Sequence, residues 1–433
     1  MGSVRSPMSS TIFDPVALRA DFSFTERDVR GRRWIYLDSA ATTQKPRAVL
    51  NAERDFSENF TSAVHRGAHA VAGEATELFE ESRVRLAAFV GVSPNEIVWT
   101  SGATAGINLL AYAISNASLG HSGADAAQFR IGPGDEIVVT EAEHHANLIP
   151  WQECAKRTGA TLRVIEVDDR GALRIDQIEQ IIGERTRIVA CAHVSNVLGT
   201  INPIVDIARR AHQYGALVVL DACQSVPHLP TNFRELDVDF AVFSGHKMLG
   251  PTGVGVLYGR AELLDALPPF LTGGSMITSV TLTDAEFLPS PQRFEAGTQP
   301  VSQAYALARA CDYLDTVGLP QIAEYEAQLG QRLAEGLSAL PGVRLLGPAP
   351  GHSRVGLASV VVDGVHAHDV GQFLDDRGIA VRVGHHCAQP LHRRYGVSAS
   401  TRISTYLYTT EDEVDAAITA VGETRAFFGA DTA

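Results

Sequence analysis

The chain has 433 residues, of which 45% are hydrophobic and 20% charged, a composition typical of a soluble globular protein. Its length predicts two domains. Its formal net charge of -14 argues against nucleic acid or an anionic membrane surface as the main partner. No stretch is long and apolar enough to span a bilayer.

The N-terminus and the cysteines indicate a cellular compartment. Residues 1–10 are polar and lack the apolar core of a signal peptide. The cysteines are sparse and odd in number, which argues against a disulfide framework. We therefore expect the protein in the reducing cytoplasm.

The middle of the chain alternates strand-like and helix-like segments. Short runs rich in valine and isoleucine cover residues 137–140, 162–167, 188–192, 217–220, 240–243 and 253–258. Amphipathic helical stretches such as 203–214 lie between several of them. Near-continuous apolar strands separated by helices predict an α/β fold with a mostly parallel sheet buried on both faces.

Beyond residue 300 a long helical region leads to a second, smaller set of strands and helices. Strand-like runs cover residues 358–362 and 379–382, and helices are expected at 368–377 and 411–427. We predict a large domain over residues 34–300 and a small C-terminal α/β domain over 301–433. Residues 1–33 are expected to form an N-terminal segment that packs with the small domain.

Polar residues follow several predicted strands, which is where ligands bind in α/β folds. After the strand-like residues 97–99, residues 100–108 read TSGATAGIN. Small and hydroxyl residues that open a helix leave free N–H groups, which suit an anion such as phosphate. Because such residues are also common helix caps, this segment alone does not decide between the two roles.

Two further strand ends carry groups that suit a flat, polar ligand. Residues 141–147 read EAEHHAN, and an imidazole such as that of His144 can stack on a ring and move protons near neutral pH. Residues 193–196 read HVSN, where Asn196 could reach an oxygen of a substrate or cofactor.

Residues 217–224 read LVVLDACQ, so a carboxylate closes an apolar strand. A buried carboxylate is costly unless it meets a cation, and a protonated ring nitrogen would be one. Gln224 could then bond a hydroxyl of the same ring. The alternative is that Asp221 caps the next helix.

Lys247 supports the interpretation of these strand ends as parts of one ligand site. It lies in SGHKMLGP at residues 244–251, directly after the strand-like residues 240–243. A lysine at such a place can lose its water and act as an amine nucleophile, which is the Schiff-base chemistry of pyridoxal phosphate enzymes. A lone lysine would be interpreted as an ordinary surface residue. With Asp221 and His144 it predicts a pyridoxal phosphate site, to which Ser244 and His246 would add phosphate donors.

Cys387 is the candidate nucleophile. It lies in VRVGHHCAQPL at residues 381–391, a loop bounded by glycine and proline, beside Arg382 and two histidines. Nearby cations favour the reactive thiolate. The other cysteines lie inside helix or strand patterns, where free thiols pack as small hydrophobes.

Paired histidines also raise the question of a metal site. They are His65 and His69, His144 and His145, His366 and His368, and His385 and His386. Zinc sites need ligands that converge in a defined geometry, and the chain contains no HExxH or CxxC motif. We expect solvated or capping histidines and no metal.

Taken together, these motifs resemble those of the SUF-type (group II) cysteine desulfurases, fold-type I, class V pyridoxal phosphate enzymes. The resemblance runs from about residue 13 to 428. It rests on YLDSAAT at 36–42, AVHRG at 63–67, EHHAN at 143–147, DACQ at 221–224, SGHK at 244–247, GGSMI at 273–277, RFEAGT at 293–298 and RVGHHCA at 382–388. The chain departs from the family at Gln299, Pro300 and Thr409.

The resemblance implies a seven-stranded, mostly parallel sheet in the large domain, and a role for each matching residue. Lys247 would carry the cofactor, His144 would stack on it, Asp221 and Gln224 would set its electronics, and Asn196 would lie beside it. Phosphate contacts would come from Thr104, Ser244 and His246, and from Thr298 of the partner subunit in a homodimer. Arg402, together with Arg382, would bind the substrate, and Cys387 would accept its sulfur.

The expected reaction converts L-cysteine to L-alanine and leaves a persulfide on Cys387. A SUF-type acceptor protein would then take the sulfur for iron–sulfur cluster assembly, and L-selenocysteine is a second expected substrate. One alternative is a class V lyase or aminotransferase acting on another amino acid, which would not need Cys387. Another is a non-catalytic sulfur carrier, which would not need Lys247.

Overall fold

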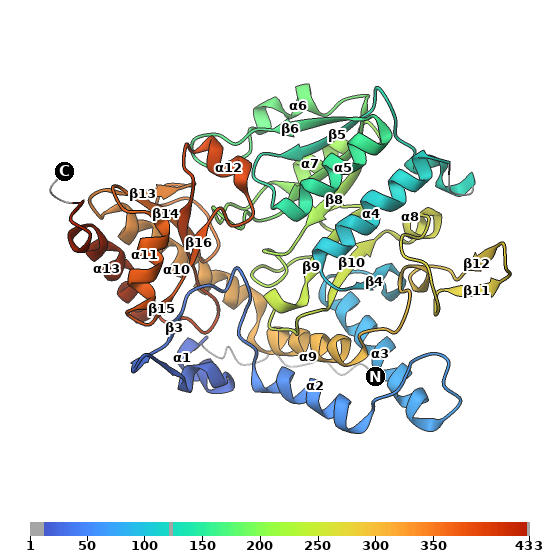
Figure 1. Cartoon of the computed structure of the whole chain (residues 1–433), viewed down its shortest axis with the longest axis horizontal. Helices are drawn as coiled ribbons and strands as arrows, with labels where there is room; N and C mark the ends of the chain where they lie inside the picture. Colours follow the sequence, from blue (N-terminus) through green and yellow to red (C-terminus); the bar gives the residue numbers. More distant parts are fainter. Residues whose placement is uncertain (1–12, 121–123, 431–433) are drawn as a thin grey trace, which may run out of the picture.

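A computed structural model describes residues 13–120 and 124–430 (Figure 1). Its centre is a seven-stranded sheet in the order β4-β10-β9-β8-β7-β5-β6. The strands are β4 (Ile97–Thr100), β5 (Glu136–Thr140), β6 (Thr161–Ile165), β7 (Thr186–Ala192), β8 (Leu217–Asp221), β9 (Phe240–Ser244) and β10 (Gly255–Gly259). Only β10 runs antiparallel to its neighbours, which confirms the predicted, mostly parallel seven-stranded sheet.

Helices cover both faces of this sheet, because successive side chains of a strand point to opposite faces. Val138 and Val218 join one apolar cluster, whereas their neighbours Val139 and Val219 join another. The first cluster packs against α2 (Arg47–Asn59), α3 (Ala70–Phe89), α6 (Ile178–Ile181), α7 (Ile204–His212) and α9 (Val301–Val317). The second packs against α4 (Ala103–Ser118), α5 (Ile149–Thr158) and α8 (Ala261–Ala266).

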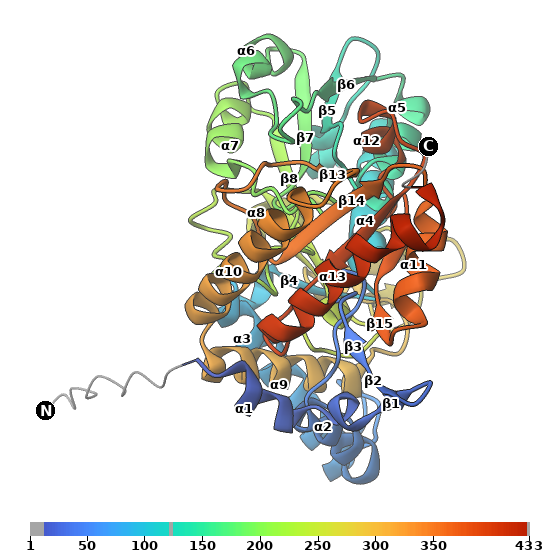
Figure 2. The same cartoon turned by 90° about the vertical axis from the view of Figure 1, so that its left-hand side faces the viewer.

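The C-terminal part forms a smaller α/β unit. Its antiparallel sheet has the order β13-β14-β17-β16. The strands are β13 (Val343–Leu346), β14 (Leu357–Val362), β16 (Arg382–Gly384) and β17 (Ser400–Ser404). A third apolar cluster joins this sheet to α10 (Leu319–Ser338), α11 (Ala367–Asp375) and α13 (Glu411–Phe427), while α12 (Gln389–Arg394) follows β16. Figure 2 shows α10, α11 and α13 around β14.

The single strand expected at residues 379–382 is wrong. β15 (Ile379–Ala380) pairs in parallel with β3 (Ile35–Tyr36), whereas β16 pairs with β17 in the four-stranded sheet. Because the two halves find different backbone partners, the strand ends at Ala380 and a new one begins at Arg382. The change of partner ties the start of the chain to its end.

The N-terminal segment contacts the C-terminal unit. The Arg19 guanidinium donates to the Tyr408 carbonyl at 2.8 Å and to Glu413 at 2.9 Å. The first twelve residues, which include the polar N-terminus, lie outside the described residues. Since α9 packs on α2 and α3 while α10 packs on α13, the helices after residue 300 contact both units, and the proposed division at residue 300 stays a prediction.

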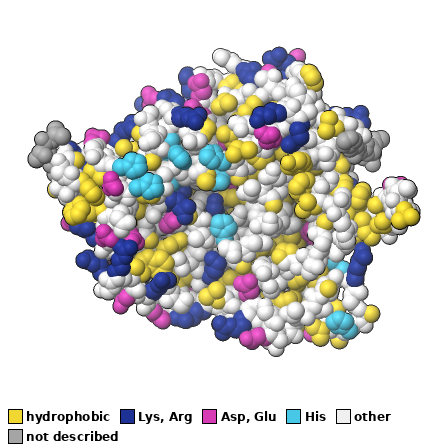
Figure 3. All heavy atoms as spheres, viewed as in Figure 1, with side chains coloured by type: hydrophobic (Ala, Val, Ile, Leu, Met, Phe, Trp, Pro, Cys, Tyr) yellow, Lys and Arg dark blue, Asp and Glu magenta, His cyan; other side chains and the backbone are white. Residues whose placement is uncertain are grey.

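The remaining short elements lie at the periphery. They are α1 (Pro15–Leu18), the hairpin of β1 (Asp28–Val29) and β2 (Arg32–Arg33), and the hairpin of β11 (Ile277–Val280) and β12 (Ala285–Phe287). Figure 3 shows acidic and basic side chains interspersed on one face, with most of its visible histidines on the left half. Within the described residues, no helix has both the length and the apolar character needed to cross a membrane.

Candidate active site

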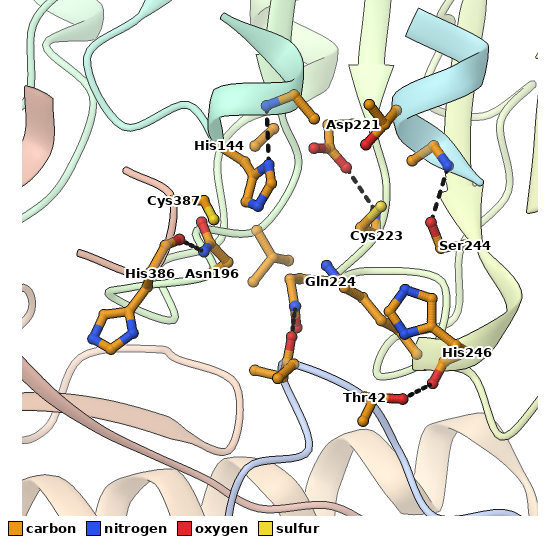
Figure 4. A pocket seen from close by; sticks show the side chains of 18 of the residues that line it. Thr42, His144, Asn196, Asp221, Cys223, Gln224, Ser244, His246, His386 and Cys387 are labelled. Atoms are coloured by element: carbon orange, nitrogen blue, oxygen red, sulfur yellow. Dashed lines mark hydrogen bonds between the residues drawn. The ribbon is translucent and has the colours of Figure 1, made fainter. Parts of the chain in front are cut away.

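A cavity of about 270 Å³ opens where the strands of the large sheet end and the C-terminal unit begins (Figure 4). Every predicted site residue except Thr298 lines it. The predicted residues in its wall are Thr104, His144, Asn196, Asp221, Gln224, Ser244, His246, Lys247, Arg382, Cys387 and Arg402. The structure therefore brings together groups that are up to about 300 residues apart in the sequence.

Lys247 and Asp221 come from neighbouring strands. Lys247 ends a single 3₁₀ turn that follows β9, and no described side chain pairs with its ammonium group. Asp221 is the last residue of β8, and one of its carboxylate oxygens accepts the Cys223 N–H at 3.0 Å. Turns rather than a helix follow Asp221, so it is not a helix cap. An unpaired cation and a buried anion thus lie in the wall of one cavity.

Cys223 also lines the cavity, although we expected it only to pack as a small hydrophobe. It belongs to the second apolar cluster as well. Burial and the charge of Asp221 raise the pKa of the Cys223 thiol to about 12. It is therefore a neutral thiol at physiological pH.

His144 is held as a neutral ring with a defined tautomer. Its Nδ1 accepts the Ala146 N–H at 3.0 Å, so the ring proton is on Nε2. Burial and the nearby Lys247 lower the pKa of His144 to about 4. A neutral imidazole with a free Nε2–H can stack on a ring and donate a proton.

The N-terminus of α4 forms an anion cradle at one side of the cavity. The Ala103 N–H donates to Ser244 Oγ at 2.9 Å, and Thr104 is exposed in the first helical turn. Close packing depends on Gly255, where an added Cβ would lie 2.5 Å from the Gly102 Cα. The free N–H groups of this sixteen-residue helix attract a negative charge.

His246 lies beside this cradle and also braces the cavity wall. Burial and Lys247 lower the pKa of its ring to about 4, so the ring is neutral. Its backbone carbonyl accepts bonds from the Thr42 hydroxyl at 3.1 Å and the Thr43 N–H at 2.9 Å. His246 thereby fastens the segment after β3 to the loop that carries Lys247.

Arg402 and Arg382 share one carboxylate, that of Asp38. Arg402 is buried on β17 and donates to Asp38 at 3.2 Å and to the Asn196 carbonyl at 2.9 Å, while its Nε has no partner among the described residues. Burial lowers its pKa to about 10, which leaves it charged. The half-exposed Arg382 grips Asp38 with two nitrogens at 3.1 and 3.0 Å.

We did not assign Asp38 a role from the sequence. The signal was available, since Asp38 closely follows the apolar strand β3, just as Asp221 closes β8. A guanidinium in a cavity wall suits a substrate carboxylate.

Glu143 is a second buried acid that the sequence interpretation missed. It accepts bonds from the Thr140 hydroxyl at 2.6 Å, the Asn147 amide at 2.7 Å and the Ala192 N–H at 3.0 Å. Complete burial outweighs these bonds and, with the charge of Asp221, raises its pKa to about 8. Glu143 joins the ends of β5 and β7 directly behind His144.

Cys387 is the exposed cysteine, whereas the other four are buried. It lies in the turn before α12, and Arg382 and Arg402 both interact with it electrostatically. The expectation that both neighbouring histidines supply positive charge is wrong for His386. Its ring is turned away toward Ser400 (Figure 4), and burial lowers its pKa to about 2.

Gln224 and Asn196 are both tied to the backbone. The Gln224 amide donates to the Ala40 carbonyl at 2.7 Å, and the Asn196 amide donates to the His386 carbonyl at 2.7 Å. Asn196 therefore joins β7 of the large sheet to the Cys387 turn.

Thr298 lies in a different cavity of about 280 Å³, lined in part by Trp99, Phe270 and Phe294. The structure therefore does not bring Thr298 to the site of its own chain. No group of three or more acidic, histidine or cysteine side chains among the described residues has an arrangement that could hold a metal ion.

The residues of the first cavity fit pyridoxal phosphate. The helix N-terminus and its hydroxyl groups suit the phosphate, Asp221 suits a protonated ring nitrogen, and Lys247 suits the aldehyde. His144 offers a neutral aromatic face beside them.

Comparison with known proteins agrees with this fit. Residues 35–417 match the model of the aminotransferase class-V family. The chain belongs to that family. This class-V protein is 50% identical to a probable cysteine desulfurase of Mycobacterium leprae, over 98% of its own length and 99% of the relative's. It is 45% identical to a probable cysteine desulfurase of Streptomyces coelicolor, over 96% and 99% of the two chains.

Solved structures of similar proteins include two cysteine desulfurases. That of Thermococcus onnurineus superposes with a TM-score of 0.86 at 37% identity, covering 98% of this class-V chain and 99% of that chain. That of Escherichia coli superposes with a TM-score of 0.85 at 35% identity, covering 96% and 100%. The similarity extends over both units of the fold.

Proposed function

We propose that the protein is a pyridoxal-phosphate-dependent cysteine desulfurase, which converts L-cysteine to L-alanine and transfers the sulfur to Cys387. One observation carries the proposal: the exposed Cys387 opens into the same cavity as Lys247, Asp221 and His144. A lyase or aminotransferase needs the last three residues but no nucleophilic cysteine. The relatives named cysteine desulfurase, at 42–50% identity, support the same conclusion.

Lys247 would hold the cofactor aldehyde, Asp221 its ring nitrogen, and the N-terminus of α4, with Thr104, Ser244 and His246, its phosphate. Gln224 would bond the ring hydroxyl, and His144 would stack on the ring. When bound, pyridoxal phosphate supplies an electron sink that makes the α-proton of an amino acid acidic.

The protein's own residues would bind the substrate and move its protons. The Arg402 fork, with Arg382 and Asn196 beside it, would bind the substrate carboxylate. The amine of Lys247, once replaced by the substrate amine, would take the α-proton. The Nε2–H of His144 is a proton donor in the same cavity.

Cys387 would carry out the sulfur transfer. Its thiolate attacks the substrate sulfur, so that an S–S bond forms while the C–S bond breaks. The electron pair of the broken bond goes to the substrate carbon, which takes a proton and becomes the methyl group of alanine. Arg382 and Arg402 lie in the wall of the same cavity, and both interact electrostatically with Cys387.

We further propose that the enzyme is a cytoplasmic homodimer that supplies a SUF-type acceptor protein for iron–sulfur cluster assembly, with L-selenocysteine as a second substrate. The motifs shared with SUF-type enzymes support this pathway. In the dimer, Thr298 would reach the cofactor of the partner subunit, which is consistent with its distance from its own site. Sedimentation of the loaded enzyme tests the dimer, and a monomer that retains full activity would contradict it.

The test of the reaction is incubation of the cofactor-loaded protein with L-cysteine. We expect alanine in solution and, by mass spectrometry, one extra sulfur atom on the peptide that contains Cys387. Cys387→Ala should abolish both, while the control Cys311→Ala, which removes a buried thiol of α9, should retain them. Undiminished alanine formation by Cys387→Ala would instead indicate a lyase or aminotransferase.

A further inference from the structure

The Cys387 turn is held in a strained backbone conformation. His386 and Cys387 are consecutive non-glycine residues with positive φ angles of 50° and 56°. Side chains rarely adopt this left-handed region, and two such residues in a row persist only where the surroundings determine the backbone. The contacts that hold this turn therefore decide where the Cys387 sulfur lies.

His145 grips the turn twice. Its backbone N–H donates to the Cys387 carbonyl at 2.6 Å, and its ring Nε2 accepts the Gln389 N–H at 3.1 Å. His145 thus contacts the residue that carries the sulfur and the first residue of α12. It belongs to the segment after β5, next to His144, so the grip joins the large sheet to the C-terminal unit.

We propose that His145 is a positioning residue, which locks the strained Cys387 turn against the cavity through its neutral ring. The proposal rests on the proposed function, because it assumes that Cys387 accepts the sulfur. Asn196 holds the same turn at the His386 carbonyl, and His386 itself bonds Ser400 at 2.9 Å. These two bonds hold the N-terminal side of the turn, whereas His145 holds the Cys387 carbonyl and the Gln389 amide on its C-terminal side.

The grip requires one protonation state. Because Nε2 accepts a bond, the ring proton must be on Nδ1, and a doubly protonated ring would turn an N–H toward the Gln389 N–H. Burial and the nearby His385 lower the pKa of His145 and so favour the neutral ring. The other charged or titratable groups around it are the Cys387 thiol of the turn itself and, along the cavity on its other side, Tyr112, His144, Glu153 and Arg157.

The test compares His145→Ala, which removes the acceptor, with His145→Gln, which keeps an acceptor that cannot be protonated. For His145→Ala we expect the single-turnover rate of sulfur transfer to fall about five- to tenfold, the factor that one hydrogen bond corresponds to, with an unchanged KM for cysteine. Hydrogen exchange of the Gln389 amide should accelerate by a similar factor. His145→Gln should restore both. We expect the transfer rate of the wild type to decrease as the pH falls and the His145 ring is protonated, and His145→Gln should lack this decrease.

His352→Ala is the matched control, since His352 is exposed and far from the turn in sequence. If His145→Ala matches the wild type in transfer rate and amide exchange, the positioning role is overturned. A loss of activity without faster Gln389 exchange, or one that His145→Gln does not rescue, also overturns it. If His145→Ala does not fold, the transfer rate of His145→Gln at low pH alone decides whether His145 has the positioning role. The separate finding that Cys387→Ala forms alanine normally would overturn the proposed function instead.

Discussion

Arg83 and Glu295 form a buried ion pair, and breaking it should strongly destabilise the protein. Arg83 on α3 donates to both Glu295 oxygens, at 2.7 and 2.9 Å, and to the Ile97 carbonyl at 2.8 Å. Both side chains are 2% exposed. In Arg83→Met the Glu295 carboxylate would keep only the Trp99 N–H, at 2.8 Å.

The expected magnitude follows from leaving one buried charge without its partner. Such a loss costs about 3–5 kcal/mol. For a cooperative unit of this size it would lower the Tm by about 3–6 °C. Arg332→Met is the matched control, because Arg332 makes an equally short pair with Asp415 at 2.7 and 2.6 Å on the surface. The loss of an exposed pair should cost at most about 1 kcal/mol.

The assay is a double-mutant cycle followed by urea unfolding. Glu295→Leu alone should destabilise the protein less than Arg83→Met, because the buried guanidinium keeps its bonds to Glu80 at 2.9 Å and to the Ile97 carbonyl at 2.8 Å. The double variant should recover most of the loss, since an apolar pair can replace a buried ion pair. Strictly additive losses, or an Arg83→Met variant as stable as Arg332→Met, would refute the reasoning.

Three further predictions concern the cavity. Lys247→Ala should fold normally by circular dichroism but form no alanine and show no visible absorbance with pyridoxal phosphate; alanine formation by this variant would contradict the assigned role. Gly255→Ala should cost about 1–3 kcal/mol of stability, because its Cβ would press on Gly102. The variant should also release pyridoxal phosphate faster on dialysis. If it retains the cofactor as well as the wild type does, the anion cradle tolerates the displacement of Gly102. Glu143 has a folded pKa of about 8 against an ordinary value of 4.5, so the folded state binds its proton more tightly and stability should fall as the pH rises from about 5 to 8. Relative to Glu143→Gln, the wild type should lose up to about 1.4 kcal/mol of unfolding free energy per pH unit in this window. Parallel curves of unfolding free energy against pH for the two proteins would contradict the raised pKa of Glu143.

The sequence predicted the parts of the site that depend on local position. Asp221 and Lys247 close parallel, neighbouring strands, whose carboxyl ends meet at one edge of the sheet. Their proximity therefore follows from the strand pattern alone. The prediction of the cofactor site did not depend on the conformations of the loops.

The features that the sequence did not reveal depend on tertiary burial. His386 looks like a cation beside Cys387, yet the packing of its ring against Ser400 makes it neutral. The role of Asp38 becomes apparent only in the folded structure, where the pairing of β3 with β15 brings Asp38 to Arg402. The division of residues 379–384 into two strands likewise reflects competition between distant backbone partners.

The ion pair between Asp38 and Arg402 has a consequence for synthesis on the ribosome. One partner is translated near the beginning of the chain and the other near its end, and β17 must pair with β14 before Arg402 is in place. The substrate-binding end of the cavity therefore cannot form on a nascent chain until nearly all residues have emerged. A product truncated before β17 could complete the large sheet, and with it the lysine and the anion cradle, yet would lack the Arg402 guanidinium that is proposed to receive the amino acid. Premature termination should therefore yield a protein that binds pyridoxal phosphate but has no catalytic activity, rather than an enzyme of reduced activity.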